Sequence, residues 1–142
     1  MTALFVDTSA LVQYYYPEKE SERIEKQILK SQHIYISGLS ITEMASALMK
    51  KIRNRELPKT EEILIWNTFM EDLQTRQIEL IFPEDRHYLR AADIIREFGV
   101  KYGIKTLDAL QLVVAHGLST ARFLCTDKVL LNLAVEMGIR LV

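Results

Sequence analysis

The fold of this chain is decided by the stretch Ala3-Leu4-Phe5-Val6-Asp7-Thr8-Ser9, close to the start of a 142-residue sequence. Its apolar residues run without alternation, which is typical of a strand that is covered on both faces within a parallel sheet. The run ends directly at the acid Asp7, and a short helix is expected to follow until Pro17 breaks it. The sequence therefore predicts a buried strand followed by a helix, with a carboxylate at the junction.

Apolar strands and amphipathic helices continue to alternate along the rest of the chain. Further strands are predicted at residues 33–37, 78–82, 122–126 and 139–142. Helices are predicted at residues 20–30, 41–54, 60–75, 86–98, 107–117 and 128–137. This alternation favours a three-layer α/β/α sandwich with a mainly parallel central sheet. No repeat, low-complexity tract or linker interrupts it, so one domain over residues 1–142 is expected.

The composition is typical of a soluble protein, with 49% apolar and 26% charged residues. No apolar run approaches the ~20 residues needed to span a bilayer. No basic stretch precedes the first apolar residues, so a signal peptide is not expected. The single cysteine, Cys125, cannot form an internal disulfide. These features favour a cytoplasmic protein without membrane contact.

Four acids stand where a strand or a turn is followed by a helix. Asp7 follows the first strand, Glu43 comes soon after the second, Asp127 follows the fourth, and Asp108 opens the apolar helix. The carboxyl ends of parallel strands share one edge of the sheet, and ligands bind at that edge. Carboxylates that meet there repel one another unless a cation joins them, and a set of oxygen donors selects a hard cation such as Mg²⁺. The spacing therefore predicts a metal site at this edge.

Each acid also has a purely structural alternative as a helix cap or as a charge on the helix dipole. The candidate arrangements are Asp7 capping the next helix, Glu43 in a capping box with Ser40, Asp108 behind a Thr106 cap, and Thr126-Asp127 capping the last helix. Against capping alone, Asp108 shares a helix face with Leu112 and Ala115. A carboxylate among such apolar groups is costly unless it is paired or bound to a metal.

Four basic residues gather at the end of one predicted helix, although the net charge of the chain is only −1. They are Lys50, Lys51, Arg53 and Arg55. One interpretation is a solvated helix end that the helix dipole favours. The other is a patch that attracts the phosphate groups of a nucleic acid.

The chain resembles PIN-domain proteins, and among these it is similar to the VapC-type toxins of prokaryotic toxin–antitoxin pairs. Four motifs carry the resemblance, and they occur in the family's order across essentially the whole chain. They are Phe5-Val6-Asp7-Thr8-Ser9-Ala10-Leu11, Ser37-Gly38-Leu39-Ser40-Ile41-Thr42-Glu43, Thr106-Leu107-Asp108-Ala109-Leu110 and Phe123-Leu124-Cys125-Thr126-Asp127-Lys128.

This resemblance implies a parallel sheet flanked by helices and an acid pocket that binds Mg²⁺ or Mn²⁺ and cleaves RNA internally. It implies metal ligands at Asp7, Glu43, Asp108 and Asp127, with Ser9 as a polar helper. In the toxins an antitoxin protein blocks the site, and the toxin commonly forms a homodimer. An antitoxin and a second copy of the chain are therefore the expected protein partners.

The last motif departs from the family pattern, which usually has a hydroxyl residue two positions before its acid. Cys125 occupies that position here, and Thr126 is the alternative source of a hydroxyl.

Two other classes of protein are alternatives. A phosphoaspartyl phosphatase would need a second acid two residues after Asp7, where Ser9 stands, and a receiver would need paired acids near the end of the first strand. A catalytically silent binding module would not need the complete set of four acids. A metal-dependent endoribonuclease of the toxin type is the interpretation that the sequence favours.

Overall fold

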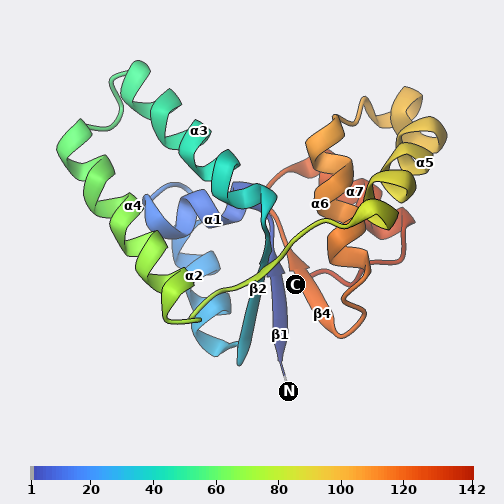
Figure 1. Cartoon of the computed structure of the whole chain (residues 1–142), viewed down its shortest axis with the longest axis horizontal. Helices are drawn as coiled ribbons and strands as arrows, with labels where there is room; N and C mark the ends of the chain where they lie inside the picture. The colour runs from blue at the N-terminus through green and yellow to red at the C-terminus, as the bar shows by residue number, and fades with distance from the viewer. Residues whose placement is uncertain (1) are drawn as a thin grey trace.

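A parallel four-stranded sheet forms the centre of the molecule in the computed structural model, which describes residues 2–142 (Figure 1). Its strands are β1 (Ala3–Val6), β2 (His33–Ser37), β3 (Glu79–Ile81) and β4 (Ala121–Leu124). They lie in the order β3-β2-β1-β4, and every neighbouring pair is parallel. The predicted parallel α/β architecture is confirmed.

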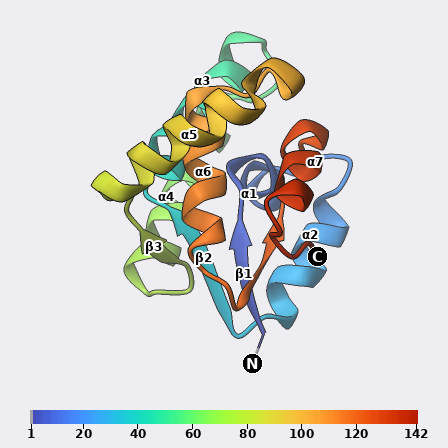
Figure 2. The same ribbon diagram turned by 90° about the vertical axis from the view of Figure 1, so that its right-hand side faces the viewer.

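Helices cover both faces of this sheet, which gives the predicted three layers. The helices are α1 (Thr8–Tyr15), α2 (Ser21–Lys30), α3 (Leu39–Arg53), α4 (Lys59–Gln74), α5 (Asp85–Tyr102), α6 (Thr106–His116) and α7 (Lys128–Glu136). The first four lie on one side of the sheet and the last three on the other, as Figures 1 and 2 show. None of the helices in the described part of the chain has the length and apolar character that crossing a membrane requires.

The alternating directions of the β1 side chains explain why this strand is apolar throughout. Leu4 and Val6 belong to the core formed with α1 to α4, whereas Phe5 belongs to the core formed with α5 to α7. All three side chains are at most 4% exposed. Burying a side chain of this size stabilises a fold by about 1.5–3 kcal/mol. A polar residue at any of these positions would therefore weaken one of the two cores.

Helix α5 differs from its prediction, because it continues through Gly99 to Tyr102 instead of ending at Phe98. The predicted end of this helix at residue 98 is therefore wrong by one turn. The helix ends at Gly103, which has a φ of 61° and donates its N–H to the Gly99 carbonyl at 2.8 Å. Gly103 thus provides the left-handed C-terminal cap, a conformation that glycine adopts at little cost. Gly99 is an ordinary helical residue.

The predicted terminal strand over residues 139–142 is reduced to a single parallel bridge between Phe123 and Leu141. Ile139 is still part of the turn that closes α7, since its N–H donates to the Ala134 carbonyl at 2.9 Å. Pairing with β4 therefore starts only at Arg140, whose carbonyl accepts from the Phe123 N–H at 2.8 Å.

The two glycines of α5 should respond in opposite directions to replacement by alanine. Gly103→Ala forces a left-handed residue and should lower the free energy of unfolding by about 1 kcal/mol. Gly99→Ala should raise it by about 0.5–1 kcal/mol, because the added Cβ would meet only Ile95 Cγ2 at 3.5 Å. Urea denaturation of both variants checks this. A larger loss for Gly99→Ala than for Gly103→Ala would show that the helix does not run through Gly99.

Candidate functional site

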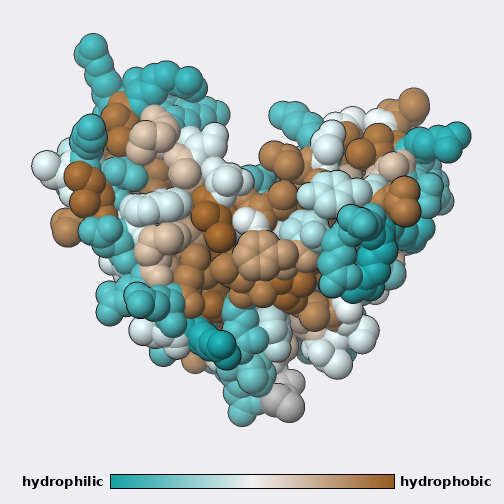
Figure 3. All heavy atoms as spheres, in the orientation of Figure 1, coloured by the Kyte–Doolittle hydropathy of each residue, from teal (hydrophilic) through white to brown (hydrophobic). Residues whose placement is uncertain are grey.

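The four predicted acids line one cavity of about 870 Å³. Asp7 reaches it from the end of β1, Glu43 from α3, Asp108 from α6 and Asp127 from the start of α7. We call this the acid cavity. Residues of α3 and of the first turn of α6 supply most of its lining, and Figure 3 shows the surface hollowed between these two helices.

Asp7 is both a helix cap and a member of the cavity. Its Oδ2 accepts hydrogen bonds from the Ser9 N–H at 3.1 Å and the Ser9 hydroxyl at 2.6 Å. Its Oδ1 accepts none from residues 2–142. The residue is only 5% exposed. Burial raises the pKa of Asp7, the Ser9 hydrogen bonds oppose that rise, and the negative charge of Glu43 adds to it.

Asp127, like Asp7, uses only one of its two carboxylate oxygens as a helix cap. Its Oδ1 accepts from the N–H groups of Val129 and Leu130 at 2.9 and 3.2 Å, so Asp127 and not Thr126 is the cap of α7. Its Oδ2 accepts no hydrogen bond within the described chain. The side chain is exposed at the rim of the acid cavity.

Glu43 makes no capping box with Ser40, and that alternative is wrong. Helix α3 begins at Leu39, so Ser40 already lies inside its first turn, where it is fully buried and bonds to the Thr8 hydroxyl at 2.8 Å. Glu43 Oε1 instead accepts from the Thr8 hydroxyl at 2.9 Å and from Gln111 Nε2 at 2.6 Å. These bonds tie Glu43 to α1 and α6.

Asp108 is the acid whose pKa responds to the charges of all three other acids. It lies in the first turn of α6, behind the cap residue Lys105 and not behind Thr106 as the capping alternative had it. Burial raises the pKa of Asp108 to about 6, and the negative charges of Asp7, Asp127 and Glu43 contribute to that rise. Lys105 opposes it. The four carboxylates are therefore close enough to repel one another.

The polar helpers around Asp7 are Ser9 and Cys125. Cys125 Sγ lies 3.6 Å from Asp7 Oδ2, and burial raises the pKa of its thiol, so the thiol is protonated near neutral pH. Cys125 thus places a neutral thiol beside the carboxylate of Asp7. Thr126 does not line the acid cavity, and its hydroxyl accepts from Gln13 Nε2 at 3.4 Å.

Of the predicted basic cluster, only Lys50 lines the acid cavity. Lys51 pairs with Glu18 and lies 4.5 Å from the centre of the Tyr16 ring, so it belongs to the fold. Arg53 and Arg55 are exposed outside the cavity lining. Lys105 is a second lining cation that the sequence reasoning missed, although it directly precedes the Thr106–Leu110 motif.

A hydrogen-bonded group of three buried polar residues lies behind Glu43, and the sequence patterns did not predict it. Thr8, Ser40 and Gln111 are at most 8% exposed and form one hydrogen-bonded group that joins α1, α3 and α6. The available signal was Gln111 itself, because it interrupts the buried apolar stretch from Ala109 to Ala115.

The donors of the acid cavity fit a hard divalent cation that keeps most of its water. Within residues 2–142, no three His, Cys, Asp or Glu side chains are placed so that together they could bind one metal ion. Mg²⁺ does not need such a cage, because it usually takes one or two carboxylates and retains several waters. Asp108 and the second oxygens of Asp7 and Asp127 accept no hydrogen bonds from the described chain, so each can bind either a metal ion or one of its waters.

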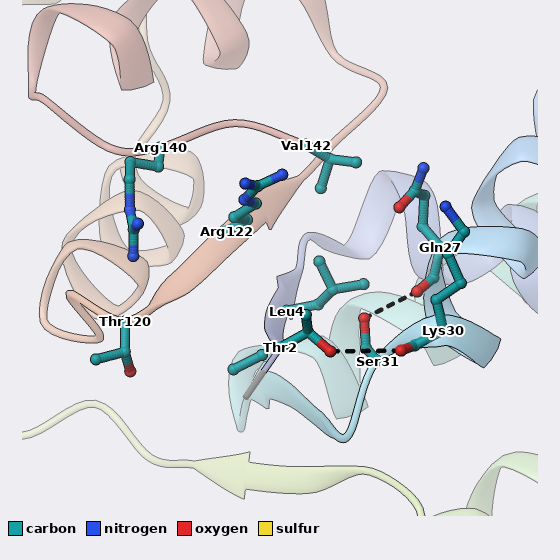
Figure 4. A pocket seen from close by; sticks show the side chains of 10 residues that line it. Thr2, Leu4, Gln27, Lys30, Ser31, Thr120, Arg122, Arg140 and Val142 are labelled. Carbon is teal, nitrogen blue, oxygen red and sulfur yellow. Dashed lines mark hydrogen bonds between the residues drawn. The ribbon is translucent and has the colours of Figure 1, made fainter.

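A second cavity, of about 330 Å³, lies at the opposite ends of the strands (Figure 4). Lys30, Arg122 and Arg140 line it, and no acid does so among the described residues. The hydroxyls of Thr2 and Ser31 donate there to the backbone carbonyls of Lys30 and Gln27, respectively. This cavity cannot provide the carboxylate chemistry of the acid cavity.

In chelator, Asp108→Asn should stabilise the fold above about pH 6 by roughly 1 kcal/mol, a figure reduced for solvent screening. The folded pKa of about 6 exceeds the ordinary value of 3.8. The folded protein therefore binds this proton more tightly, and wild-type stability falls as the pH rises from about 4 to 6. Urea denaturation near pH 4 and pH 8 should show equal stabilities at the lower pH and a more stable variant at the higher. A less stable variant at pH 8 would mean that the carboxylate mainly supports the start of α6.

Comparison with known proteins places this geometry in a family. The PIN domain profile matches residues 4–136. The crystal structure of PAE2754 from Pyrobaculum aerophilum shares the fold, with a TM-score of 0.63 and 20% identity over 96% of this chain and 90% of that chain. Among curated protein sequences none matches. PIN domains are generally nucleases that act on RNA or other nucleic acid, usually with divalent metals. Because the profile match spans most of its length, this chain belongs to the PIN domain family.

Proposed function

We propose that this chain is a divalent-metal-dependent endoribonuclease that hydrolyses phosphodiester bonds of RNA. The observation that carries the proposal is the meeting of Asp7, Glu43, Asp108 and Asp127 at one cavity, where burial and the charges of the other three acids raise the pKa of Asp108. Membership of a family that consists mainly of nucleases supports it. The preference for RNA rests on the resemblance to the VapC-type toxins.

Asp7 and Asp108 are the residues that would bind the metal directly. Asp7 keeps Oδ1 unbonded while Ser9 fixes Oδ2, and Asp108 accepts no hydrogen bond from residues 2–142. A bound Mg²⁺ or Mn²⁺ would supply a hydroxide from water at neutral pH and would neutralise charge on the phosphate.

The remaining residues of the cavity orient water and substrate. Glu43 has Oε1 fixed by Thr8 and Gln111, so its Oε2 is the atom that would accept a hydrogen bond from a metal-bound water. In that place Glu43 would support the ion through its water and would take the proton of an attacking water. Asp127 has Oδ2 unbonded at the exposed rim, where it can orient a second water. Lys50 and Lys105 line the same cavity and provide positive charge for the phosphate groups of a single strand.

Purified protein should cleave single-stranded RNA internally only when Mg²⁺ or Mn²⁺ is present. Asp7→Asn should lower kcat about a hundredfold or more, since metal stabilisation of the transition state is worth several kcal/mol. Asparagine is also a good helix cap, so the variant should stay folded. Gel analysis of a defined RNA, with thermal melting of the variant, checks this. RNA cleavage that survives both chelator and Asp7→Asn would contradict the proposal, and a pure wild type without any cleavage would favour the silent binding module.

Lys50→Ala provides the contrast to Asp7→Asn, because it should act on RNA binding and not on the chemical step. It should raise KM and reduce the slope of log affinity against log salt by about 1, with little change in kcat. Arg53→Ala is the matched control, since Arg53 lies on the same helix but not on the cavity. Equal effects of the two variants would count against the cavity as the path of the RNA.

We also propose that the chain is the toxin of a toxin–antitoxin pair and forms a homodimer. Apart from the resemblance, the support is apolar surface on α3 and α4, where Met49, Ile63 and Leu64 are 48, 49 and 66% exposed. Met44 of α3 and Phe69 of α4 are fully buried in the core and are not part of this surface.

Sedimentation velocity at micromolar concentration should show a dimer that Leu64→Asp dissociates. Leu29→Asp is the control, because Leu29 is 72% exposed but belongs to a different helix, α2. A wild type that stays monomeric throughout the concentration range would contradict the homodimer. Failure to bind the protein encoded by the neighbouring gene would contradict the toxin assignment.

A further inference from the structure

Gln111 is a buried polar residue that the fold alone does not explain. It is 1% exposed and lies among apolar residues of α6. Its Nε2 is 2.6 Å from Glu43 Oε1, 3.1 Å from Thr8 Oγ1 and 3.0 Å from Ser40 Oγ. Its Oε1 is buried and has no hydrogen-bond partner in the described part of the chain. A buried acceptor without a partner costs about 1–3 kcal/mol, and such a group calls for an explanation.

Glu43 determines which way the Gln111 amide points. If the amide were turned by 180°, Gln111 Oε1 would face Glu43 Oε1 across the 2.6 Å contact, and two acceptors would repel. The observed orientation avoids that repulsion but leaves Oε1 without a partner. The cost of the buried acceptor is therefore a consequence of the hydrogen bond to Glu43.

The hydrogen bonds of Gln111, Ser40 and Thr8 all lead to one acceptor atom, Glu43 Oε1. One Gln111 N–H reaches Glu43 Oε1, and the other is shared between Thr8 and Ser40. The Ser40 hydroxyl can then donate to Thr8, whose own hydroxyl donates to Glu43 Oε1. Glu43 Oε2 accepts no hydrogen bond from residues 2–142, while Glu43 lines the acid cavity.

We infer that Gln111 is a positioning residue that fixes Glu43 Oε1 and so presents Glu43 Oε2 to the acid cavity. This inference rests on the proposed nuclease function, because it is the reaction that requires Glu43 in one orientation. Gln111 itself touches neither metal nor substrate. Its contribution passes through Glu43.

The test is Gln111→Met, which removes the donor and fills the same buried space with an unbranched apolar side chain. Outer hydrogen-bond partners of metal-site residues typically contribute 10–100-fold to metal affinity or activity. Calorimetry should therefore show Mn²⁺ affinity about 10–100-fold weaker, and kcat should fall with little change in KM. Urea stability should stay equal or rise, because the unpartnered Oε1 is gone. Gln111→Leu keeps the test available if the methionine variant does not fold.

A double-mutant cycle with Glu43→Ala separates positioning from a general structural role. In the Glu43→Ala background, Gln111→Met should leave Mn²⁺ affinity unchanged. An equal loss of affinity in both backgrounds would overturn the inference. A loss of stability with unchanged Mn²⁺ affinity in the single variant would also overturn it, because Gln111 would then only join the helices.

Failure of the proposed function is a different result. If wild-type protein neither binds Mn²⁺ nor cleaves RNA, the nuclease proposal falls, and crystal structures of wild type and Gln111→Met then decide the positioning of Glu43. A Glu43 carboxylate that turns away in the variant supports the inference, and one that stays in place overturns it.

Discussion

Parallel pairing of β1 with β2 on one side and with β4 on the other is the constraint on which the acid cavity depends. Because the strands run in one direction, the residues that follow them emerge at the same edge of the sheet. Asp7 directly follows β1, and its N–H bonds to the Leu124 carbonyl at 2.9 Å, at the end of β4. Folding thus brings acids that are far apart in the sequence to one cavity. The burial of Asp108 there, together with the charges of the other three acids, raises its pKa.

Three of the four acids share one arrangement, in which one carboxylate oxygen accepts hydrogen bonds from the fold and the other does not. Ser9 fixes one oxygen of Asp7, the N-terminal amides of α7 fix one oxygen of Asp127, and Thr8 with Gln111 fixes one oxygen of Glu43. In each case the other oxygen accepts nothing from the described chain. Capping and metal binding are therefore not competing explanations for Asp7 and Asp127. The cap orients the carboxylate and leaves one oxygen for a ligand.

The sequence was sufficient for the architecture and for the positions of the acids, because both follow from local patterns. Continuous apolar runs mark strands covered on both faces, and the acids stand at the junctions that follow. Element ends were less predictable: Gly99 and Gly103 look alike in the sequence, and only Gly103 adopts a positive φ.

The partners of each side chain depend on tertiary contacts that no local pattern contains. Lys50 and Lys51 are adjacent in the sequence, yet one lines the acid cavity and the other pairs with Glu18. The hydrogen bonds of Gln111 reach residues 68 to 103 positions away, so its polar character was visible in the sequence but its link to Glu43 was not.

The central claim is that a hard divalent cation binds in the acid cavity. Anomalous X-ray diffraction from crystals soaked in Mn²⁺ tests it most directly, because the signal locates the ion without reference to activity. An anomalous peak is expected in the acid cavity next to the carboxylates of Asp7 and Asp108, and it should be lost in Asp7→Asn. A cavity without any peak at millimolar Mn²⁺, or an ion bound only at another place on the protein, would contradict it.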